Sequence, residues 1–368
     1  MSIFVSSNLI IIIFILCLVL SSYFISKLQL SATTFDSLSR NSPLDGLRGI
    51  LALSVFVHHF FITFIWKTTG EWDHPQSNVL DNFGAIPVSY FFLITGYLFL
   101  NKIKQNEVDW KKLFKSRIRR IAPLYYFVAT FVIIFTLLSV NIHDYSVSQI
   151  FKWLKGWIIF NGKSLGDFQS TIIIAGVNWT LIYEWGFYFS LPLLHAIYHK
   201  KINNKKYFYI TLIIFIVIFL DTKRSHYLLF ILSILSIIYK DKIKILVEKK
   251  SYLLNIIIPS LVLISFIFTT HFSTIQKCLT ATIFAFIANG YDFKGILKNK
   301  GLKVLGDISY STYLLHGLVL YILFSIFNIY NFENSMFNYF SLFPIIFLIV
   351  IVISILSYKF IERPFLKR

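Results

Sequence analysis

A few ionisable side chains lie within long apolar stretches of this sequence, and they are the first candidates for chemistry. Arg48 and His59 share one stretch, Glu184 lies in a second and His316 in a third. If the first stretch is a helix, Arg48 and His59 lie about three turns apart on one face. An imidazole accepts a proton near neutral pH, and a guanidinium matches the oxygens of a phosphate. Because such groups are costly in an apolar environment, we expect them to have a function.

The positions of these groups along their predicted helices indicate a cluster. Counting about 1.5 Å per residue from the helix ends places His59, His316 and Glu184 at a similar depth, with Arg48 nearer the cytoplasmic end. We therefore expect a His–Glu–His cluster, and we expect His58, which points about 100° away from His59, to be a packing residue. Two simpler interpretations stay open. A histidine in a helix bundle often forms only an interhelical hydrogen bond, and Glu184 could serve only to neutralise a positive charge.

Two pairs of residues have spacings that occur in metal sites. His195 and His199 are spaced as in His-x-x-x-His, and Glu71 and His74 as in Glu-x-x-His. The first pair lacks the glutamate of a metalloprotease helix, and the second lies in a predicted loop. The two cysteines are too few and too far apart for a zinc site. We therefore expect no metal.

The composition indicates the environment of these groups. Only 14% of the 368 residues are charged and 57% are hydrophobic, whereas soluble domains are about 25% charged. The charges are unequal, with 35 Lys and Arg against 17 Asp and Glu. A nucleic-acid-binding surface needs its basic residues on a face exposed to water, and this chain has little polar surface. The composition argues against a soluble enzyme, a disordered chain and a nucleic-acid partner.

Apolar stretches of roughly 20 residues, long enough to cross a bilayer as helices, recur along the whole chain. They are continuously apolar rather than alternating, which argues against a β-barrel. We predict an all-α polytopic membrane protein with about eleven transmembrane helices, at residues 3–25, 47–66, 83–100, 121–140, 179–198, 207–220, 227–239, 252–270, 279–291, 304–327 and 342–360.

The Lys and Arg residues are concentrated in alternate connections between these stretches. Positively charged short loops stay in the cytoplasm. This rule places the N-terminus outside and the C-terminus in the cytoplasm, in a protein of the cell (inner) membrane. The segment 151–160, in an outer connection, has the Trp and Lys spacing of a helix that lies in the membrane interface.

One connection, residues 101–120, carries a cluster of basic residues that includes Arg117, Arg119 and Arg120. Such a cluster beside a membrane span often only fixes topology and contacts anionic lipid headgroups. It could also bind the phosphates of a ligand. The composition does not separate these two interpretations. The glycine patterns of Walker and Rossmann nucleotide sites are absent from the sequence.

Six motifs, in chain order, resemble those of acyltransferase family 3, the integral membrane acyltransferases that include bacterial O-antigen O-acetylases. They are LDGLRG at 44–49 with His59, FFLITGY at 91–97, the arginine cluster at 117–120, the segment 179–192 with Glu184, LGDISY at 305–310 with His316, and IERP at 361–364. Some positions depart from the family pattern. Thr95 replaces a serine, Ser116 replaces the first arginine of the cluster, and only Glu184 remains of a Glu-Glu-Gln segment.

The resemblance implies transfer of an acyl group, most often acetyl, from cytoplasmic acyl-CoA to a hydroxyl of a cell-surface carbohydrate such as O-antigen, capsule or exopolysaccharide. It implies that His59 acts as general base or transient acyl carrier and that Glu184 orients its imidazole. His316 and Tyr310 are secondary candidates for the acceptor side or for an oxyanion donor.

The resemblance also assigns the donor side and the domains. Arg48 is expected to bind the pantetheine or phosphate end of acetyl-CoA, and Arg117, Arg119 and Arg120 are candidates for its nucleotide phosphates. The acyltransferase domain is expected to span residues 41–368 with ten core helices. Residues 1–40 would add an N-terminal helix and a cytoplasmic linker.

Two functions from other classes remain alternatives. A polysaccharide flippase or transporter would also have many spans and buried charges, but it would need no acyl-CoA. A glycan polymerase would be expected to carry a large, basic outer loop, and the predicted outer connections hold few Lys and Arg. The expected partners are therefore acyl-CoA, a glycan or glycolipid acceptor and the lipid bilayer. The acceptor, the acyl group and the oligomeric state are not indicated.

Overall fold

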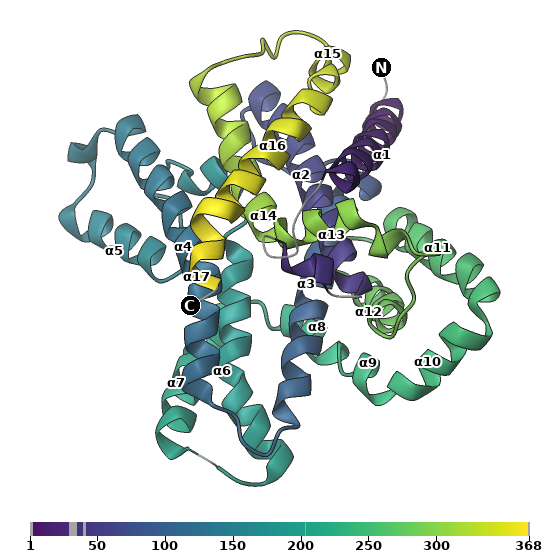
Figure 1. Cartoon of the computed structure of the whole chain (residues 1–368). Helices are drawn as coiled ribbons and strands as arrows, with labels where there is room; N and C mark the ends of the chain where they lie inside the picture. Colours follow the sequence, from purple (N-terminus) through teal and green to yellow (C-terminus); the bar gives the residue numbers. More distant parts are fainter. Residues whose placement is uncertain (1–2, 29–34, 40–41, 203, 367–368) are drawn as a thin grey trace.

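The computed structural model describes residues 3–28, 35–39, 42–202 and 204–366 as a bundle of helices (Figure 1). Its α-helices are α1 (Ile3–Lys27), α2 (Pro43–Thr69), α3 (Asn78–Ile103), α4 (Trp110–Ser139), α5 (Val147–Ile158), α6 (Trp179–His199), α7 (Lys205–Asp221), α8 (Tyr227–Leu232), α9 (Leu235–Ile238), α10 (Lys240–Lys249), α11 (Ser251–Phe268), α12 (Thr274–Ala288), α13 (Lys300–Asp307), α14 (Ser309–Tyr321), α15 (Met336–Ser341), α16 (Phe343–Ser357) and α17 (Arg363–Leu366). Short 3-10 helices lie at Asp36–Ser39, Ile142–Asp144, Ser170–Ile174, Arg224–His226 and Ile296–Lys298, and π-helical segments at Ile322–Ile326 and Tyr358–Glu362.

The helical fold confirms the predicted class, an all-α polytopic membrane protein. Among the described residues, seven helices are long and apolar enough to cross a membrane: Asn8–Lys27, Pro43–Thr69, Asn78–Ile103, Trp110–Ser139, Ser251–Phe268, Ser309–Ile326 and Met336–Leu366. The other predicted spans also form helices, but two of them, Arg224–Ile238 and Thr274–Ala288, are short. The count of eleven spans therefore stays a prediction. Part of the predicted linker, residues 29–34 and 40, lies outside the described residues.

The predicted span 304–327 is interrupted rather than continuous. Helix α13 ends at Asp307 and α14 begins at Ser309, with Ile308 between them. The Asp307 carboxylate accepts hydrogen bonds from the backbone N–H of Ser37 at 3.0 Å and from its hydroxyl at 2.7 Å. These bonds stabilise the end of α13 and connect it to the segment before α2. Asp307 therefore has a structural role.

Helix α2, which carries Arg48 and His59, lies at the centre of the bundle against α3, α13 and α14 (Figure 1). Glycines make the contact with α13 possible. A Cβ atom built on Gly306 of α13 would overlap the carbonyl oxygen of Asp45 in α2, and one on Gly46 would overlap the carbonyl oxygen of Leu297. The glycines of the two motifs thus let the backbones approach closely.

This contact predicts the effect of a single added methyl group. Gly306→Ala is expected to lower the free energy of unfolding by about 1–3 kcal/mol, the usual cost of overpacking. The thermal unfolding midpoint of the detergent-purified protein measures it. Ser260→Ala, at an exposed position of α11, is the control and should leave the midpoint unchanged. An unchanged midpoint for Gly306→Ala would contradict the close contact.

The arginine cluster lies on a helix instead of in the predicted loop. Helix α4 begins at Trp110, and the side chain of Asp109 caps it by accepting a hydrogen bond from the backbone N–H of Lys112 at 2.9 Å. On a helix, Arg117 and Arg120 are three residues apart and share a face, whereas Arg119 points elsewhere. The helix therefore places Arg117 and Arg120 on one face and Arg119 on another.

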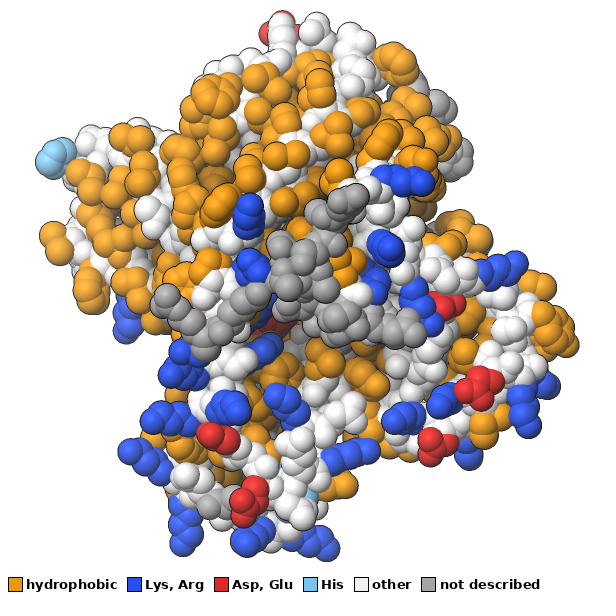
Figure 2. Space-filling view, viewed as in Figure 1, with side chains coloured by type: hydrophobic (Ala, Val, Ile, Leu, Met, Phe, Trp, Pro, Cys, Tyr) orange, Lys and Arg blue, Asp and Glu red, His pale blue; other side chains and the backbone are white. Residues whose placement is uncertain are grey.

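Charged and apolar side chains gather on different parts of the surface. Figure 2 shows Lys and Arg collected over the lower half of the molecule, around the lower ends of α4, α6 and α7 and along α10, whereas apolar side chains cover much of the upper half. The predicted interfacial helix forms as α5, with Trp153 and Trp157 buried on one face. This distribution agrees with a basic face beside an apolar belt.

Candidate active site

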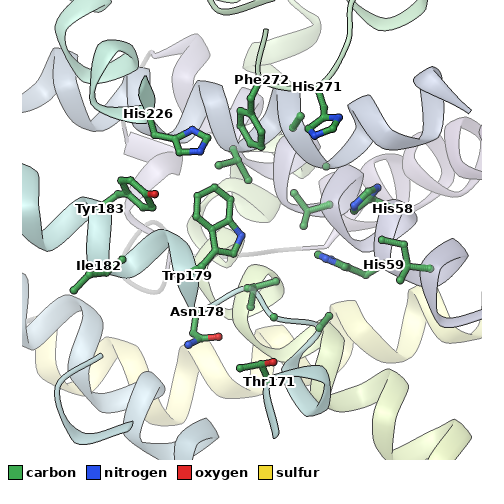
Figure 3. A pocket seen from close by; sticks show the side chains of 18 of the residues that line it. His58, His59, Thr171, Asn178, Trp179, Ile182, Tyr183, His226, His271 and Phe272 are labelled. Carbon is green, nitrogen blue, oxygen red and sulfur yellow. The ribbon is translucent and has the colours of Figure 1, made fainter. Parts of the chain in front are cut away.

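Two of the cavities among the described residues are lined by predicted site residues, and each has its own chemistry. The larger, of about 650 Å³, is lined by His59 and is called here the histidine cavity. Figure 3 shows His59 from α2 and Trp179 from α6 pointing into it from opposite sides. The smaller, of about 430 Å³, is lined by Arg48, Arg117 and Arg120 and is called the arginine cavity.

The structure brings His59 and His316 together as predicted. Their rings lie within hydrogen-bonding distance, with 2.9 Å between Nδ1 of His59 and Nε2 of His316. His316, on α14, is fully buried, and its Nδ1 lies 2.9 Å from the carbonyl oxygen of Thr312. A carbonyl can only accept, so Nδ1 of His316 is the donor. In the neutral ring, Nε2 of His316 is then the acceptor for the Nδ1–H of His59.

This hydrogen-bond order defines the chemistry of His59. With its proton on Nδ1, the neutral ring has its lone pair on Nε2. His59 is half-buried and lines the cavity, and the indole of Trp72 stacks over it with 6.1 Å between ring centroids and an angle of 22°. The imidazole is therefore held in one orientation and one tautomer. That is the state in which a histidine accepts a proton from a bound hydroxyl.

Glu184 lies away from the histidine pair, in contrast to the predicted cluster. Its carboxylate accepts hydrogen bonds from the hydroxyls of Thr95 at 3.3 Å and Tyr188 at 3.4 Å, and it lines the arginine cavity. The prediction rested on depth along the helices, and depth does not decide towards which cavity a side chain of α6 points. The structure replaces the His–Glu–His cluster with a His–His pair in which His316 orients His59.

The arginine cavity combines positive side chains with buried carboxylates. Arg117 and Arg48 interact electrostatically with Glu184, and Arg120 interacts with Glu362. Arg117 also lies over the ring of Phe99, 5.1 Å from its centroid. Neighbouring charges and an aromatic face hold these guanidinium groups in place at the wall of a cavity. Such a wall can bind an anionic ligand through planar, paired hydrogen bonds.

Two other predicted residues, Arg119 and Tyr310, line cavities other than the one that His59 lines. Arg119 lines a separate, smaller cavity beside α17, together with Lys112 and Lys115. Tyr310 was a secondary candidate for the acceptor side or for an oxyanion donor. It lines the arginine cavity, and its hydroxyl donates to the carbonyl oxygen of Ile121 at 2.8 Å. The helical path of α4 and the break before α14 set these positions, and neither was predicted.

Sequence reasoning did not single out Glu362 as a site residue. It is 1% exposed, accepts a hydrogen bond from the Ser311 hydroxyl and interacts with Arg120 and Arg48. A buried carboxylate needs such partners because its charge is costly to remove from water. The signal was present in the IERP motif, whose glutamate is Glu362.

Two side chains, Val88 of α3 and Tyr313 of α14, line both cavities. The Tyr313 hydroxyl donates to the Thr180 hydroxyl at 3.1 Å and lies 3.4 Å from the carbonyl oxygen of Val177. Thr180 lines the arginine cavity and Val177 the histidine cavity. The two cavities therefore meet at this tyrosine, which sequence reasoning also missed.

Two pairs among the seven tryptophans differ in their positions relative to the cavities. Trp153 and Trp157 are buried in the hydrophobic core and do not line either cavity. Trp72 and Trp179 line the histidine cavity, where an aromatic face can stack on a sugar ring. Trp72 and Trp179 therefore present aromatic faces to this cavity, whereas Trp153 and Trp157 do not.

The described residues thus form an all-α membrane bundle that holds a histidine cavity and an arginine cavity. The model of the acyltransferase domain, family 3, matches residues 41–359, and the chain belongs to this family. It is thus a multi-pass membrane protein of an acyltransferase family.

Two curated relatives are similar in sequence to part of this chain. A peptidoglycan O-acetyltransferase, OatA, of Listeria monocytogenes is 24% identical over 173 residues, which cover 44% of this chain and 25% of the relative. An O-acetyltransferase, also named OatA, of Staphylococcus aureus is 24% identical over 163 residues, 41% of this chain and 24% of the relative. The match thus spans about a quarter of the length of these relatives. No solved structure matches the chain.

Proposed function

We propose that this protein transfers an acyl group, most simply acetyl, from acyl-CoA in the arginine cavity to a hydroxyl of a cell-surface carbohydrate in the histidine cavity. One observation carries the proposal: two cavities of different chemistry meet at Val88 and Tyr313. A positively charged pocket suits a donor with phosphates, and a pocket with a base and two indole rings suits a sugar hydroxyl.

The donor side rests on the arginine cavity. Coenzyme A carries several phosphate charges, and Arg48, Arg117 and Arg120 supply guanidinium groups along one wall. In this arrangement Glu184 and Glu362 hold the arginines in position rather than reacting. The thioester end of the donor then extends towards Tyr313.

The acceptor side rests on His59. Nε2 of His59 takes the proton of the sugar hydroxyl while the hydroxyl oxygen attacks the thioester carbonyl carbon. The carbon–sulfur bond breaks, the thiolate leaves with coenzyme A, and the imidazolium returns its proton to that thiolate. In an alternative order, the Nε2 lone pair attacks the thioester carbonyl carbon, the carbon–sulfur bond breaks and the thiolate leaves. The sugar hydroxyl then attacks the acylimidazolium, the carbon–nitrogen bond breaks, and the thiolate takes the hydroxyl proton.

The name of one relative adds a candidate to the proposed acceptors. The Listeria relative is named for peptidoglycan. Peptidoglycan therefore joins O-antigen, capsule and exopolysaccharide among the acceptors, all of which are outside the cytoplasm. This fits an arginine cavity open to the cytoplasm and a histidine cavity open to the outside, in the cell (inner) membrane.

The test compares cells with and without the gene. Surface glycans and peptidoglycan are isolated separately and their O-acetyl groups are measured by NMR and mass spectrometry. An acetyl ester that disappears with the gene and returns with it on a plasmid supports the proposal. Unchanged acetylation together with loss of the glycan from the surface would instead indicate a flippase.

His316 is expected to act through His59 as a positioning residue. His316→Ala should lower kcat by about 10–100-fold, as loss of a supporting hydrogen bond does, and leave the KM for acetyl-CoA unchanged. His316→Gln, whose carbonyl oxygen can accept the Nδ1–H of His59, should recover part of the activity. Steady-state kinetics and the pH–rate profile check this. Equal losses in both variants would contradict the orienting role.

The proposed orientation predicts where single cysteines react. In a protein with Cys17 and Cys278 changed to serine, a cysteine at exposed His143 should be labelled by an impermeant maleimide from outside. A cysteine at exposed Lys201 should be labelled only after the cells are opened. The reverse pattern would invert the orientation and with it the assignment of the two cavities.

A further inference from the structure

Four metal-binding side chains converge at one wall of the histidine cavity, from separate parts of the chain. His58 comes from α2, His74 from the loop after it, Asp81 from the first turn of α3 and His271 from the loop between α11 and α12. Figure 3 shows His58, His59 and His271 on the same side of the cavity. The proposed acyl transfer uses none of these four residues.

Asp81 is at the centre of the group. One of its carboxylate oxygens lies 2.8 Å from Nδ1 of His74, and the other lies 2.8 Å from Nδ1 of His271. The two imidazole rings stack, with 5.0 Å between centroids and an angle of 17°. The side chains of His74 and His271 are 63% and 48% exposed, so an ion from solvent can reach them.

His58 adds a buried nitrogen to this group. Ligand atoms of His58, His74 and Asp81 all lie within 4.8 Å of one another. His58 is 6% exposed, and its Nδ1 donates to the carbonyl oxygen of Leu80 at 2.8 Å. Nε2 of His58 is then the ring nitrogen with a free lone pair. A histidine ligand of a metal usually has this form, with its second nitrogen hydrogen-bonded to a carbonyl.

Gly84 provides the space for this imidazole. It lies three residues after Asp81, on the same face of α3. A Cβ atom built on Gly84 would lie 2.8 Å from Nε2 of His58, closer than side chains pack. The missing side chain thus lets Nε2 of His58 lie over the helix face that carries Asp81.

We propose that His58, His74, Asp81 and His271 bind a zinc ion at the mouth of the histidine cavity. Three imidazoles and one carboxylate suit zinc, which takes four such ligands in a tetrahedral arrangement. Ligand atoms of His58, His74 and Asp81 already lie within 4.8 Å of one another. His271 contacts Asp81 and would complete the set by a movement of its half-exposed side chain. The ion replaces the protons shared between Asp81 and the two neighbouring histidines.

The zinc ion would fix the wall of the acceptor cavity. It connects the loop after α2 and the loop before α12 to the start of α3, and His58 is adjacent to His59. Without metal, the same residues form a hydrogen-bonded clamp, in which the bond to Asp81 raises the pKa of His74. The two states differ in zinc content, which an experiment measures directly.

The test uses the full chain in detergent, purified with a tag that contains no histidine. After chelation and dialysis against zinc, mass spectrometry of the metal should find about one zinc per chain. Cobalt in place of zinc should give the intense visible absorption of a tetrahedral site. No zinc retained by the wild type, or only the weak spectrum of octahedral cobalt, would overturn the proposal.

Variants identify the ligands. Loss of a hydrogen bond that only supports a ligand weakens metal binding by about 10–100-fold. Asp81→Asn and His271→Gln each remove a ligand, so each should weaken zinc binding by more than that. His226→Gln is the matched control, because His226 lines the opposite side of the same cavity (Figure 3) and should leave zinc binding unchanged. Gel filtration confirms that each variant is folded. If one is not, the cobalt spectrum of the wild type decides. Equal zinc binding in all folded variants would overturn the proposed site.

Discussion

His59→Ala is expected to lower the rate of acyl transfer by about 10²–10⁴-fold, the contribution of a general base. His316 accepts the Nδ1 proton of His59, which leaves the lone pair on Nε2 of His59, the proposed base, facing the histidine cavity. Alanine removes that base and its orientation together. Transfer of labelled acetyl from acetyl-CoA to glycan in membrane vesicles measures the rate.

The control for this variant is His143→Ala, which changes an exposed histidine that lines neither cavity. Its rate should match the wild type when both proteins are present in the membrane at equal amounts. A His59→Ala protein that keeps most of the activity would remove His59 from the mechanism.

Arg48→Lys is expected to raise the KM for acetyl-CoA by about 10–100-fold, the effect of losing a charged hydrogen bond of about 1.5–3 kcal/mol. Arg48 lines the arginine cavity and interacts with Glu184 and Glu362. Lysine keeps the charge but cannot form the planar pair of hydrogen bonds. Initial rates over a range of acetyl-CoA concentrations give KM and kcat separately.

Arg119→Lys is the matched comparison, because Arg119 lies in the same cluster but lines the separate cavity beside α17. Its effect on KM should be smaller than that of Arg48→Lys. A larger rise in KM for Arg119→Lys than for Arg48→Lys would instead place the donor in the cavity beside α17.

The fold could be predicted from the sequence where one physical property decides the structure. Continuous apolar stretches formed helices because a bilayer leaves backbone groups no other partners. The pair of His59 and His316 was also predicted, since both were counted along helices that run through the centre of the bundle. Breaks such as the one at Ile308 were not, because they depend on a distant side chain, Ser37, binding Asp307.

The positions of charged residues around the helix axes were harder to predict. Glu184 was placed at the right depth for a histidine cluster but points to the other cavity, where Thr95 and Tyr188 bind it. The proposed zinc ligands come from four segments, so no local spacing contains them all. Loops bring His74 and His271 to Asp81, and a sequence pattern carries no information on that approach.

Val88 and Tyr313 are the shared boundary of the two cavities, and this has a consequence for the cell as a whole. If the cavities open to opposite sides of the membrane, as proposed, coenzyme A stays on its own side and only a small acyl fragment crosses. The boundary at Val88 and Tyr313 would then have to pass the acyl fragment without passing protons, because a proton leak would discharge the proton gradient across the membrane. On this proposal, the hydrogen bonds that anchor Tyr313 to Val177 and Thr180 would hold that boundary in place and so would also preserve the proton gradient.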